Sequence, residues 1–280
     1  MLSIDILNSF KEKNRTLLPD FAKYINKQKY NDRSKYHKKN HNWIKKDNLL
    51  PKNNWFKKNK DNDEKLYSKF TSILNKLTDN NLVYLHDKLI NLEIENKNHL
   101  EKLINLIFYK AMSEPKFSKM YANLCLKLST FYLIVDDNKI FLKEFLINKC
   151  QHIFNETLRI SNESEFELND TFKFKEQIDG SIIFIGELYN HDLLNNKIIN
   201  LCFKLIFNKL NNNGNNSFLI KNICILLKKV GKKFSYNNEN IVKIINKIDE
   251  LKNHKDIQLK EKFTIMDVLD LKIKEKWKIN

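Results

Sequence analysis

The sequence predicts an all-α protein, a solenoid of about five antiparallel helix pairs preceded by a basic N-terminal arm that is disordered when free. From residue 65 onward, apolar residues recur at steps of three and four, which is the spacing of a buried helix face. Turn-rich or acidic breaks divide this region into segments of helical length. Before residue 65, Lys and Asn dominate and no such periodicity is present. We therefore expect an arm over residues 1–64 and a helical domain over 65–280.

The stretch Ile73–Leu128 shows the helical pattern most clearly. One apolar stripe predicts a buried face, made of Leu100, Leu103, Ile104, Ile107, Phe108 and Ala111. Ser113 is expected to be the N-cap of the next helix, and Pro115 to lie in its first turn, where a missing N–H is tolerated. The second stripe consists of Tyr121, Leu124, Cys125 and Leu128. Together the two stripes predict a helical hairpin.

Helix pairs of about forty residues that each expose an apolar face cannot stand alone, so we expect them to stack into a curved solenoid of HEAT-repeat type. The breaks that separate them include VDDNK, NNNGNNS and SYNNEN, and Ser161–Thr171 is expected to be an acidic surface loop. The expected pairs are 65–77 with 80–92, 98–112 with 116–129, 138–158 with 174–190, 194–210 with 216–231, and 238–252 with 257–271.

Positive charge is concentrated in the arm. The 280 residues contain 50 Lys and Arg against 34 Asp and Glu, and a net charge of +16 favours polyanionic partners such as RNA. Phe21–Lys60 holds thirteen basic and two acidic side chains, so this window alone carries +11. From Tyr24 to Lys60 aromatic residues alternate with lysines, which suits single-stranded RNA because rings stack on bases and lysines neutralise phosphates. The alternative is a solvated linker. An AT-rich coding genome would also produce its abundance of lysine and asparagine.

Several function classes find no support in the residues. No apolar run of about eighteen residues predicts a membrane span, and the first residues lack the layout of a secretory signal, so we expect a cytoplasmic protein. No glycine-rich loop could hold a nucleotide phosphate, and His37 and His41 lack further metal ligands, so no cofactor is expected. The cysteines are expected to be free thiols at apolar helix positions: Cys125, Cys150, Cys202 and Cys224.

No local spacing of residues predicts a nucleophile, a general base or a metal cage. Glu187, Asp267 and Asp270 are more typical of ion-pair partners, helix caps or solvated faces than of catalytic carboxylates. We therefore expect a protein that acts by binding and not an enzyme. A helical enzyme with a cleft site is the alternative from a different class, and a deep pocket lined by several ionisable groups would support it.

Four segments carry a family resemblance, in the order ILNKLT, LINLIFYKAMSEPKFSKMYANLC, GSIIFIGELY and MDVLDL. Together they resemble the middle domain of translation initiation factor 4 gamma, the scaffold of the cap-binding complex. The resemblance extends roughly from Trp55 to Trp277, and the chain would be a short or minimal form of this family, or a fragment. The sequence departs from the family pattern at Ile183, where the family has a lysine. It departs again at Lys260 and Lys262, which replace arginines and lose their bidentate geometry.

The resemblance implies binding to a DEAD-box RNA helicase of the initiation factor 4A type. Trp55 in NNWFKK occupies the place of a family tryptophan that touches this helicase, and Trp43 in HNWIKK is a rival. Leu74, Leu77 and Leu82 match family positions whose loss disrupts helicase binding. Their apolar spacing indicates that they act partly by holding the first hairpin together.

The arm is expected to bind mRNA and a cap-binding subunit. The start of the chain, which predicts a short helix over 2–13, resembles the family site for the cap-binding subunit, initiation factor 4E. Leu7 and Phe10 match this site, whereas Leu2 replaces its tyrosine and Asn8 replaces an apolar residue. The residues expected to contact RNA are Lys35, Lys38, Lys39, Trp43, Lys45, Lys46, Lys57 and Lys58.

The resemblance thus implies a translation initiation scaffold that binds a helicase, mRNA and a cap-binding subunit, while the helicase hydrolyses ATP. Another protein with the same middle domain, acting in mRNA splicing or nonsense-mediated decay, is the alternative. The sequence motif SEPKFSKMYANLC favours the translation initiation factors over these alternatives.

Overall fold

The computed structural model describes residues 54–135, 137–160, 168–213, 217–237, 240–255 and 257–278. The chain divides into two units, Met1–Lys52 and Asn53–Asn280, and every described residue belongs to the second unit. The elements within these residues are α3 (Asn54–Asn75), α4 (Leu82–Ile90), α5 (Lys97–Ser113), the 3-10 turn η1 (Pro115–Phe117), α6 (Ser118–Leu128), β1 (Tyr132–Val135), β2 (Asn138–Phe141), α7 (Leu142–Ile160), α8 (Leu168–Asn190), α9 (Asn196–Asn213), α10 (Ser217–Asn237), α11 (Asn240–Lys252) and α12 (Leu259–Lys274).

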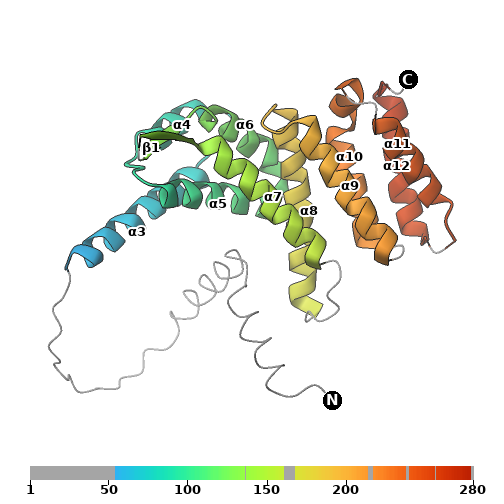
Figure 1. Ribbon diagram of the computed structural model, residues 1–280, viewed down its shortest axis with the longest axis horizontal. Coiled ribbons are helices and arrows are strands. Elements are labelled where there is room, and N and C mark those ends of the chain that lie inside the picture. The colour runs from blue at the N-terminus through green and yellow to red at the C-terminus, as the bar shows by residue number, and fades with distance from the viewer. Residues whose placement is uncertain are drawn as a thin grey trace, which may run out of the picture. The chain divides into compact units, whose positions relative to one another are not determined.

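The helices pack in two layers (Figure 1). In one layer α3 contacts α5, α5 contacts α7, and α7 contacts α9. In the other, α4, α6, α8, α10 and α12 contact one another in succession, and each helix also packs on its sequence neighbour as a pair. This arrangement confirms the predicted all-α solenoid of about five helix pairs. Of the predicted arm, residues 1–53 lie outside the described residues.

The central hairpin buries the side chains that the sequence pattern selected. Every residue of the two predicted stripes is buried, from Leu100 through Ala111 on α5 and from Tyr121 through Leu128 on α6. The ring of Phe108 meets that of Phe184 edge-on, with 4.9 Å between the ring centroids, and so joins α5 to α8. These contacts place the main core between the two layers.

The first helix begins earlier than expected, at Asn54 instead of residue 65. No glycine or proline interrupts the chain between Asn54 and Asn75. Followed towards the N-terminus, the first residue that breaks a helix is Pro51. Asp63 also gains a tertiary partner, because the buried His99 contacts its carboxylate through Nε2 at 3.0 Å. The Glu95 N–H donates to the other ring nitrogen, which leaves Nε2 as the donor to Asp63.

A β-hairpin replaces the start of the expected helix 138–158. Strands β1 and β2 pair antiparallel, with Val135 opposite Asn138, so the turn has only two residues. Asp137 in this turn has φ of 61°, a left-handed conformation that Asp tolerates and that a two-residue hairpin requires. The short apolar run YLIV, which ends in the β-branched Ile134 and Val135, is compatible with a strand, and this turn commits it to one. Helix α7 begins only after β2, at Leu142.

Two further expectations about helix ends are corrected. Ser113 is the last residue of α5 and makes no cap, because Glu114 separates it from the 3-10 turn. Pro115 does lie in the first turn, as predicted. The hydroxyl of Ser118 donates to the carbonyl of Ala111 at 3.1 Å, which ties the start of α6 to the end of α5. Helix α8 begins at Leu168, so the last part of the expected loop 161–171 is helical, while residues 161–167 lie outside the described residues.

Gly231 and Trp277 provide a test of the packing at the end of the stack. The Trp277 indole is buried against Gly231 of α10, where an added Cβ would overlap the ring. Gly231→Ala should therefore destabilise the protein by about 1–3 kcal/mol through overpacking. Elsewhere in a helix the same change normally stabilises by up to about 1 kcal/mol. Urea unfolding measures the difference.

The control for this prediction is a double variant. In a Trp277→Leu background the smaller side chain leaves room for the new methyl group, so Gly231→Ala should cost much less or become stabilising. An equal cost of Gly231→Ala in both backgrounds would contradict the proposed contact.

Candidate partner-binding surface

The three leucines predicted to take part in helicase binding lie inside the first helix pair. Leu74 on α3, Leu77 in the connection and Leu82 at the start of α4 are all buried. In this conformation a partner cannot contact their side chains, so their burial supports the role of holding the hairpin together. A direct role in helicase binding stays a prediction.

The connection between α3 and α4 is held by one side chain. Asn81 accepts a hydrogen bond from the Thr78 backbone N–H through Oδ1 at 2.8 Å. Its Nδ2 donates to the Lys76 carbonyl, also at 2.8 Å. Because these bonds satisfy backbone groups that the end of α3 leaves open, the loop has a defined shape and positions α4.

The outer surface of α4 exposes apolar side chains next to these buried leucines. Val83 is 59% exposed and Tyr84 is 60% exposed, whereas Leu82 and Leu85 on either side face the core. The Lys88 ammonium lies 4.6 Å from the centroid of the Tyr84 ring, a cation–π contact that orients the ring. Exposed aromatic side chains of this kind are frequent anchors in protein interfaces.

Val83 and Tyr84 were not among the predicted binding residues, although the sequence carries a signal for their exposure. Residues 82–85 read LVYL, an apolar run of four in a helix of nine residues. Successive helical positions are about 100° apart, so four in a row span most of the circumference of the helix, and on a helix that packs on one side only some of them are exposed. On α4 these are Val83 and Tyr84.

For the other residues predicted to bind partners, the structure does not describe the side chains. Trp55, Lys57 and Lys58 belong to the first turns of α3, but only the backbone of this part of the helix is described. The remaining predicted residues lie outside the described part of the chain: Leu2, Leu7, Phe10, Lys35, Lys38, Lys39, Trp43, Lys45 and Lys46.

Two of the three carboxylates considered as catalytic candidates, Glu187 and Asp267, are ion-pair partners between helices. Glu187 on α8 accepts from Lys229 of α10 at 2.8 Å, and Asp267 on α12 accepts from Lys228 at 3.0 Å. These pairs confirm the structural interpretation of Glu187 and Asp267. The two bonds connect neighbouring helices of one layer.

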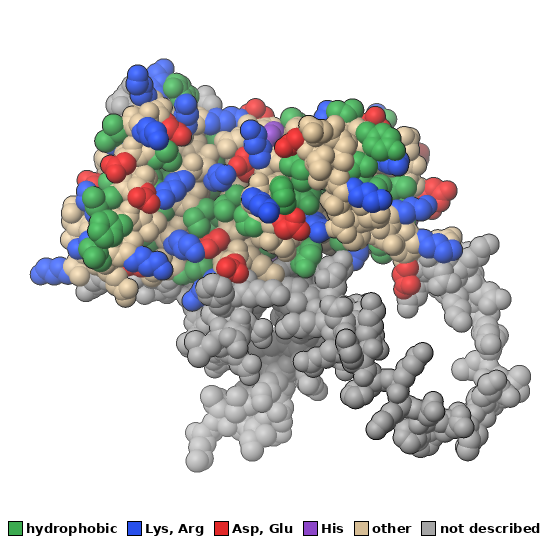
Figure 2. All heavy atoms as spheres, turned by 180° about the vertical axis from the view of Figure 1, so that it is seen from behind, with side chains coloured by type: hydrophobic (Ala, Val, Ile, Leu, Met, Phe, Trp, Pro, Cys, Tyr) green, Lys and Arg blue, Asp and Glu red, His purple; other side chains and the backbone are tan. Residues whose placement is uncertain are grey.

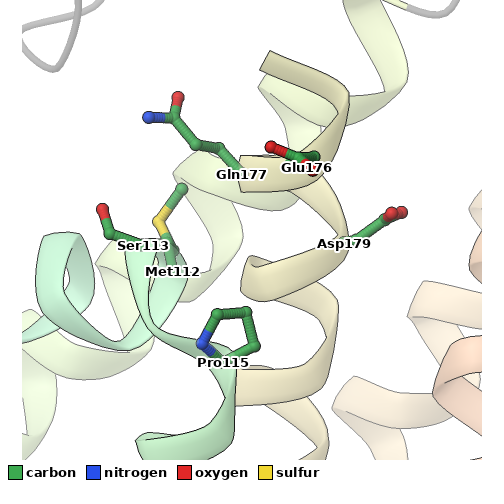
Figure 3. A pocket seen from close by; sticks show the side chains of 6 residues that line it. All are labelled: Met112, Ser113, Pro115, Glu176, Gln177 and Asp179. Carbon is green, nitrogen blue, oxygen red and sulfur yellow. The ribbon is translucent and has the colours of Figure 1, made fainter. Parts of the chain in front are cut away.

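A pocket of about 370 Å³ lies between the end of α5 and the middle of α8 (Figure 3). The Asp179 carboxylate accepts from Lys221 of α10. Burial raises the pKa of Asp179, and the hydrogen bond and charge of Lys221 act in the opposite direction. No histidine or cysteine lines the pocket, and its ionisable groups are the carboxylates of Glu176 and Asp179. Its lining residues are Met112, Ser113, Pro115, Glu176, Gln177 and Asp179.

The four cysteines are free and buried, which confirms their expected positions on apolar helix faces. Burial raises the pKa of the Cys202 thiol to about 12, and likewise raises that of Cys224 to about 12. Burial also raises the pKa of Cys125 and Cys150. Because the thiolate is the reactive form, these residues are packing groups at neutral pH and not nucleophiles.

Metal-binding clusters and membrane spans are both absent from the described residues. These residues contain no group of three or more His, Cys, Asp or Glu side chains that could hold a metal ion. No helix among them is long and apolar enough to cross a membrane.

The helix stack and its exposed apolar surface define a class of protein, the helical-repeat scaffolds that act through their faces. Residues 68–275 match the family model of the MIF4G domain, and this match spans most of the chain. The chain therefore belongs to the MIF4G domain family. This confirms the resemblance to the middle domain of translation initiation factor 4 gamma.

Relatives and a solved structure agree with this assignment. The chain is 28% identical over 234 residues to eukaryotic translation initiation factor 4G of Arabidopsis thaliana, an alignment that covers 78% of the chain. It is 27% identical over 238 residues to eukaryotic translation initiation factor 4 gamma 3 of Homo sapiens, covering 75% of the chain. These alignments cover only 13% and 14% of the relatives' own lengths.

The fold is also that of a solved domain. The crystal structure of the MIF4G domain of Trypanosoma cruzi translation initiation factor EIF4G5 superposes with a TM-score of 0.52 at 18% identity. The match covers 76% of this chain and 98% of that one. At this identity the similarity shows a shared fold.

Proposed function

We propose that the chain is a cytoplasmic translation initiation scaffold that binds a DEAD-box RNA helicase of the factor 4A type, mRNA and the cap-binding subunit. The observation that carries the proposal is an exposed pair, Val83 and Tyr84, on the first helix pair of a MIF4G domain. The chain contributes no chemistry of its own in this scheme. It biases the two lobes of the helicase towards a productive arrangement, and the helicase hydrolyses ATP.

Helicase binding through α4 explains the leucine positions without requiring a partner to reach them. Leu74, Leu77 and Leu82 are buried in the helix pair α3–α4 and hold the helix that carries the exposed pair. Truncating a buried leucine costs about 2–5 kcal/mol of stability, which would disturb α4 and weaken binding indirectly. The exposed pair and Trp55 are the residues that we expect to touch the helicase.

Tyr84→Ala should raise the Kd for a factor 4A helicase about tenfold to a hundredfold, because an exposed aromatic anchor is lost while the fold is kept. Trp55→Ala should have a similar effect. Isothermal titration calorimetry with the purified helicase measures both, and thermal unfolding of each variant checks the fold.

The matched control for this prediction is Tyr236→Ala, which removes an aromatic ring that is 55% exposed on α10. It should bind helicase as tightly as the parent. Leu74→Ala should lose affinity together with thermal stability, in contrast to Tyr84→Ala. If Tyr84→Ala bound as tightly as the parent, the α4 surface would not be the helicase site.

The proposed mRNA site is the basic segment Phe21–Lys60, which carries +11 of the net charge of +16 and leaves +5 for the rest of the chain. Changing Lys35, Lys38, Lys39 and Lys45 to Gln should weaken binding to a single-stranded oligonucleotide. The slope of log K against log salt should fall by about 3, because each phosphate contact on a single strand contributes about 0.7. Fluorescence anisotropy over a range of salt concentrations measures the slope.

Four exposed lysines of the helical unit serve as the matched control, and they are Lys119, Lys204, Lys232 and Lys243. Changing them to Gln removes the same charge and should leave the slope nearly unchanged. Equal losses in both variants would assign RNA binding to overall charge and remove the special role of Phe21–Lys60.

The cap-binding subunit is proposed to fold the segment Leu2–Phe10 into a helix that buries Leu7 and Phe10. Calorimetry of a peptide spanning residues 1–31 against a factor 4E subunit should detect binding that Leu7→Ala abolishes. Leu2→Tyr should tighten binding by up to about tenfold, because a buried hydrogen bond is worth about 0.5–1.5 kcal/mol. No heat from the parent peptide or the Leu2→Tyr peptide would assign this segment another role.

A further inference from the structure

Helix α12, the last helix described, has apolar residues on two opposite sides. One side faces α10 and α11 and buries Glu261, Ile265 and Val268. The other side exposes four large apolar residues. Figure 2 shows hydrophobic and basic side chains next to one another at the end of the helical unit where α11 and α12 lie. The exposed residues are Leu259 at 68%, Phe263 at 55%, Met266 at 44% and Ile273 at 70%.

These four residues, which we call the α12 stripe, form one straight line along the helix. At 100° per residue they all lie within about 40° of the direction of Leu259. With a rise of 1.5 Å per residue, the stripe from Leu259 to Ile273 is about 21 Å long, or four turns. Its width is that of one helix, which is the footprint that a second helix packed on α12 would cover.

The described helices that pack on α12, α10 and α11, lie on the side opposite the stripe. Asp270 lies within the stripe, between Met266 and Ile273, and the exposed apolar area on either side of it is large enough to mark an interaction site. On α4, by comparison, the exposed apolar residues number two, Val83 and Tyr84.

Lysines flank the stripe on both sides. At helical spacing Lys262 lies on one side and Lys260 and Lys274 lie on the other. None of the three makes an ion pair with another described residue, whereas the nearby Asp267 is already paired with Lys228. The three lysines therefore offer positive charge that an acidic partner would neutralise, against one negative charge from Asp270 within the stripe.

We propose that the α12 stripe is the docking site of an amphipathic helix of a partner protein, whose apolar face is flanked by Asp and Glu. The length and width of the stripe match a helix, and the lysine flanks select an acidic one. Each end of the stripe then contributes an ion-pair partner, and Phe263 near its N-terminal end provides an aromatic anchor.

Other occupants fit less well. A second copy of this chain would place Lys260 and Lys262 against Lys274 in an antiparallel pair, and the repulsion would oppose pairing. The segment Phe21–Lys60, with its charge of +11, is repelled in the same way. Nucleic acid gains little from the aliphatic side chains of the stripe, because bases stack on aromatic rings.

The test uses the full chain and two synthetic helical peptides about four turns long. Both carry leucines at i, i+4, i+7 and i+11, and one has Glu and the other Lys at the flanking positions. Fluorescence anisotropy should show that the Glu-flanked peptide binds at least about tenfold more tightly than the Lys-flanked one. The joint variant Phe263→Ser with Ile273→Ser should lose this binding while its unfolding temperature stays that of the parent.

Two further variants separate the stripe from general charge attraction. Changing Lys260, Lys262 and Lys274 to Glu should reverse the preference between the peptides, although the basic arm is unchanged. The control pair Leu201→Ser with Ile134→Ser removes exposed apolar groups from α9 and β1 and should bind as the parent does. Equal binding by the parent and by Phe263→Ser with Ile273→Ser would overturn the proposal.

Two other outcomes would also overturn it. If sedimentation showed the parent chain to be a dimer and the stripe variant a monomer, the occupant would be a second copy. If a photo-crosslinker at Phe263 captured a segment of the same chain, the stripe would serve an intramolecular contact. Helicase binding through α4 is measured separately, so its failure would leave this proposal intact.

Discussion

The close approach of α8 to the end of α5 is the contact on which the rest of the stack depends. Gly180 permits it, because a Cβ at this position would overlap the backbone carbonyl of Met112. The buried rings of Phe108 and Phe184 complete the junction, and α8 goes on to contact α6 and α10. A helix pair buries its apolar face only against its neighbours, so weakening this junction would expose the core on both sides.

The residues that the sequence could predict are those governed by helical periodicity. Leu100 through Ala111 had to share one face, and in the structure they are buried together. The hairpin at β1 and β2 escaped prediction because its signal is short: YLIV fits either a strand or a buried helical turn, and the conformation of Asp137 decides between them. The early start of α3 escaped prediction because residues 54–64 show no apolar periodicity, and the contact that Asp63 makes with His99 joins residues far apart in the chain.

The sequence analysis selected the helix pair that carries the candidate surface, but it did not select the exposed side chains, Val83 and Tyr84. The family motif led to Leu74, Leu77 and Leu82, which are buried, because a motif records every residue that a function needs, including those that only hold the fold. Separating the two roles requires knowing which side of α4 faces the core. That depends on the packing of α4 against α3 and α6, which no local pattern specifies.

Charged contacts fix the relation of α8 to α10, and so the spacing of the surfaces at either end of the stack. Lys233 of α10 donates to the carbonyls of Tyr189 and Asn190 at 3.0 Å each, where the end of α8 leaves them without intrahelical partners. This cation also meets the negative end of the helix dipole, and Glu187 pairs with Lys229 one turn away. A register fixed by such bonds resists sliding better than apolar contacts alone, since those tolerate small shifts at little cost. Under the proposed function, the separation of the two docking faces sets the effective concentration of the partners, so the ionic contacts between α8 and α10 would bear on function.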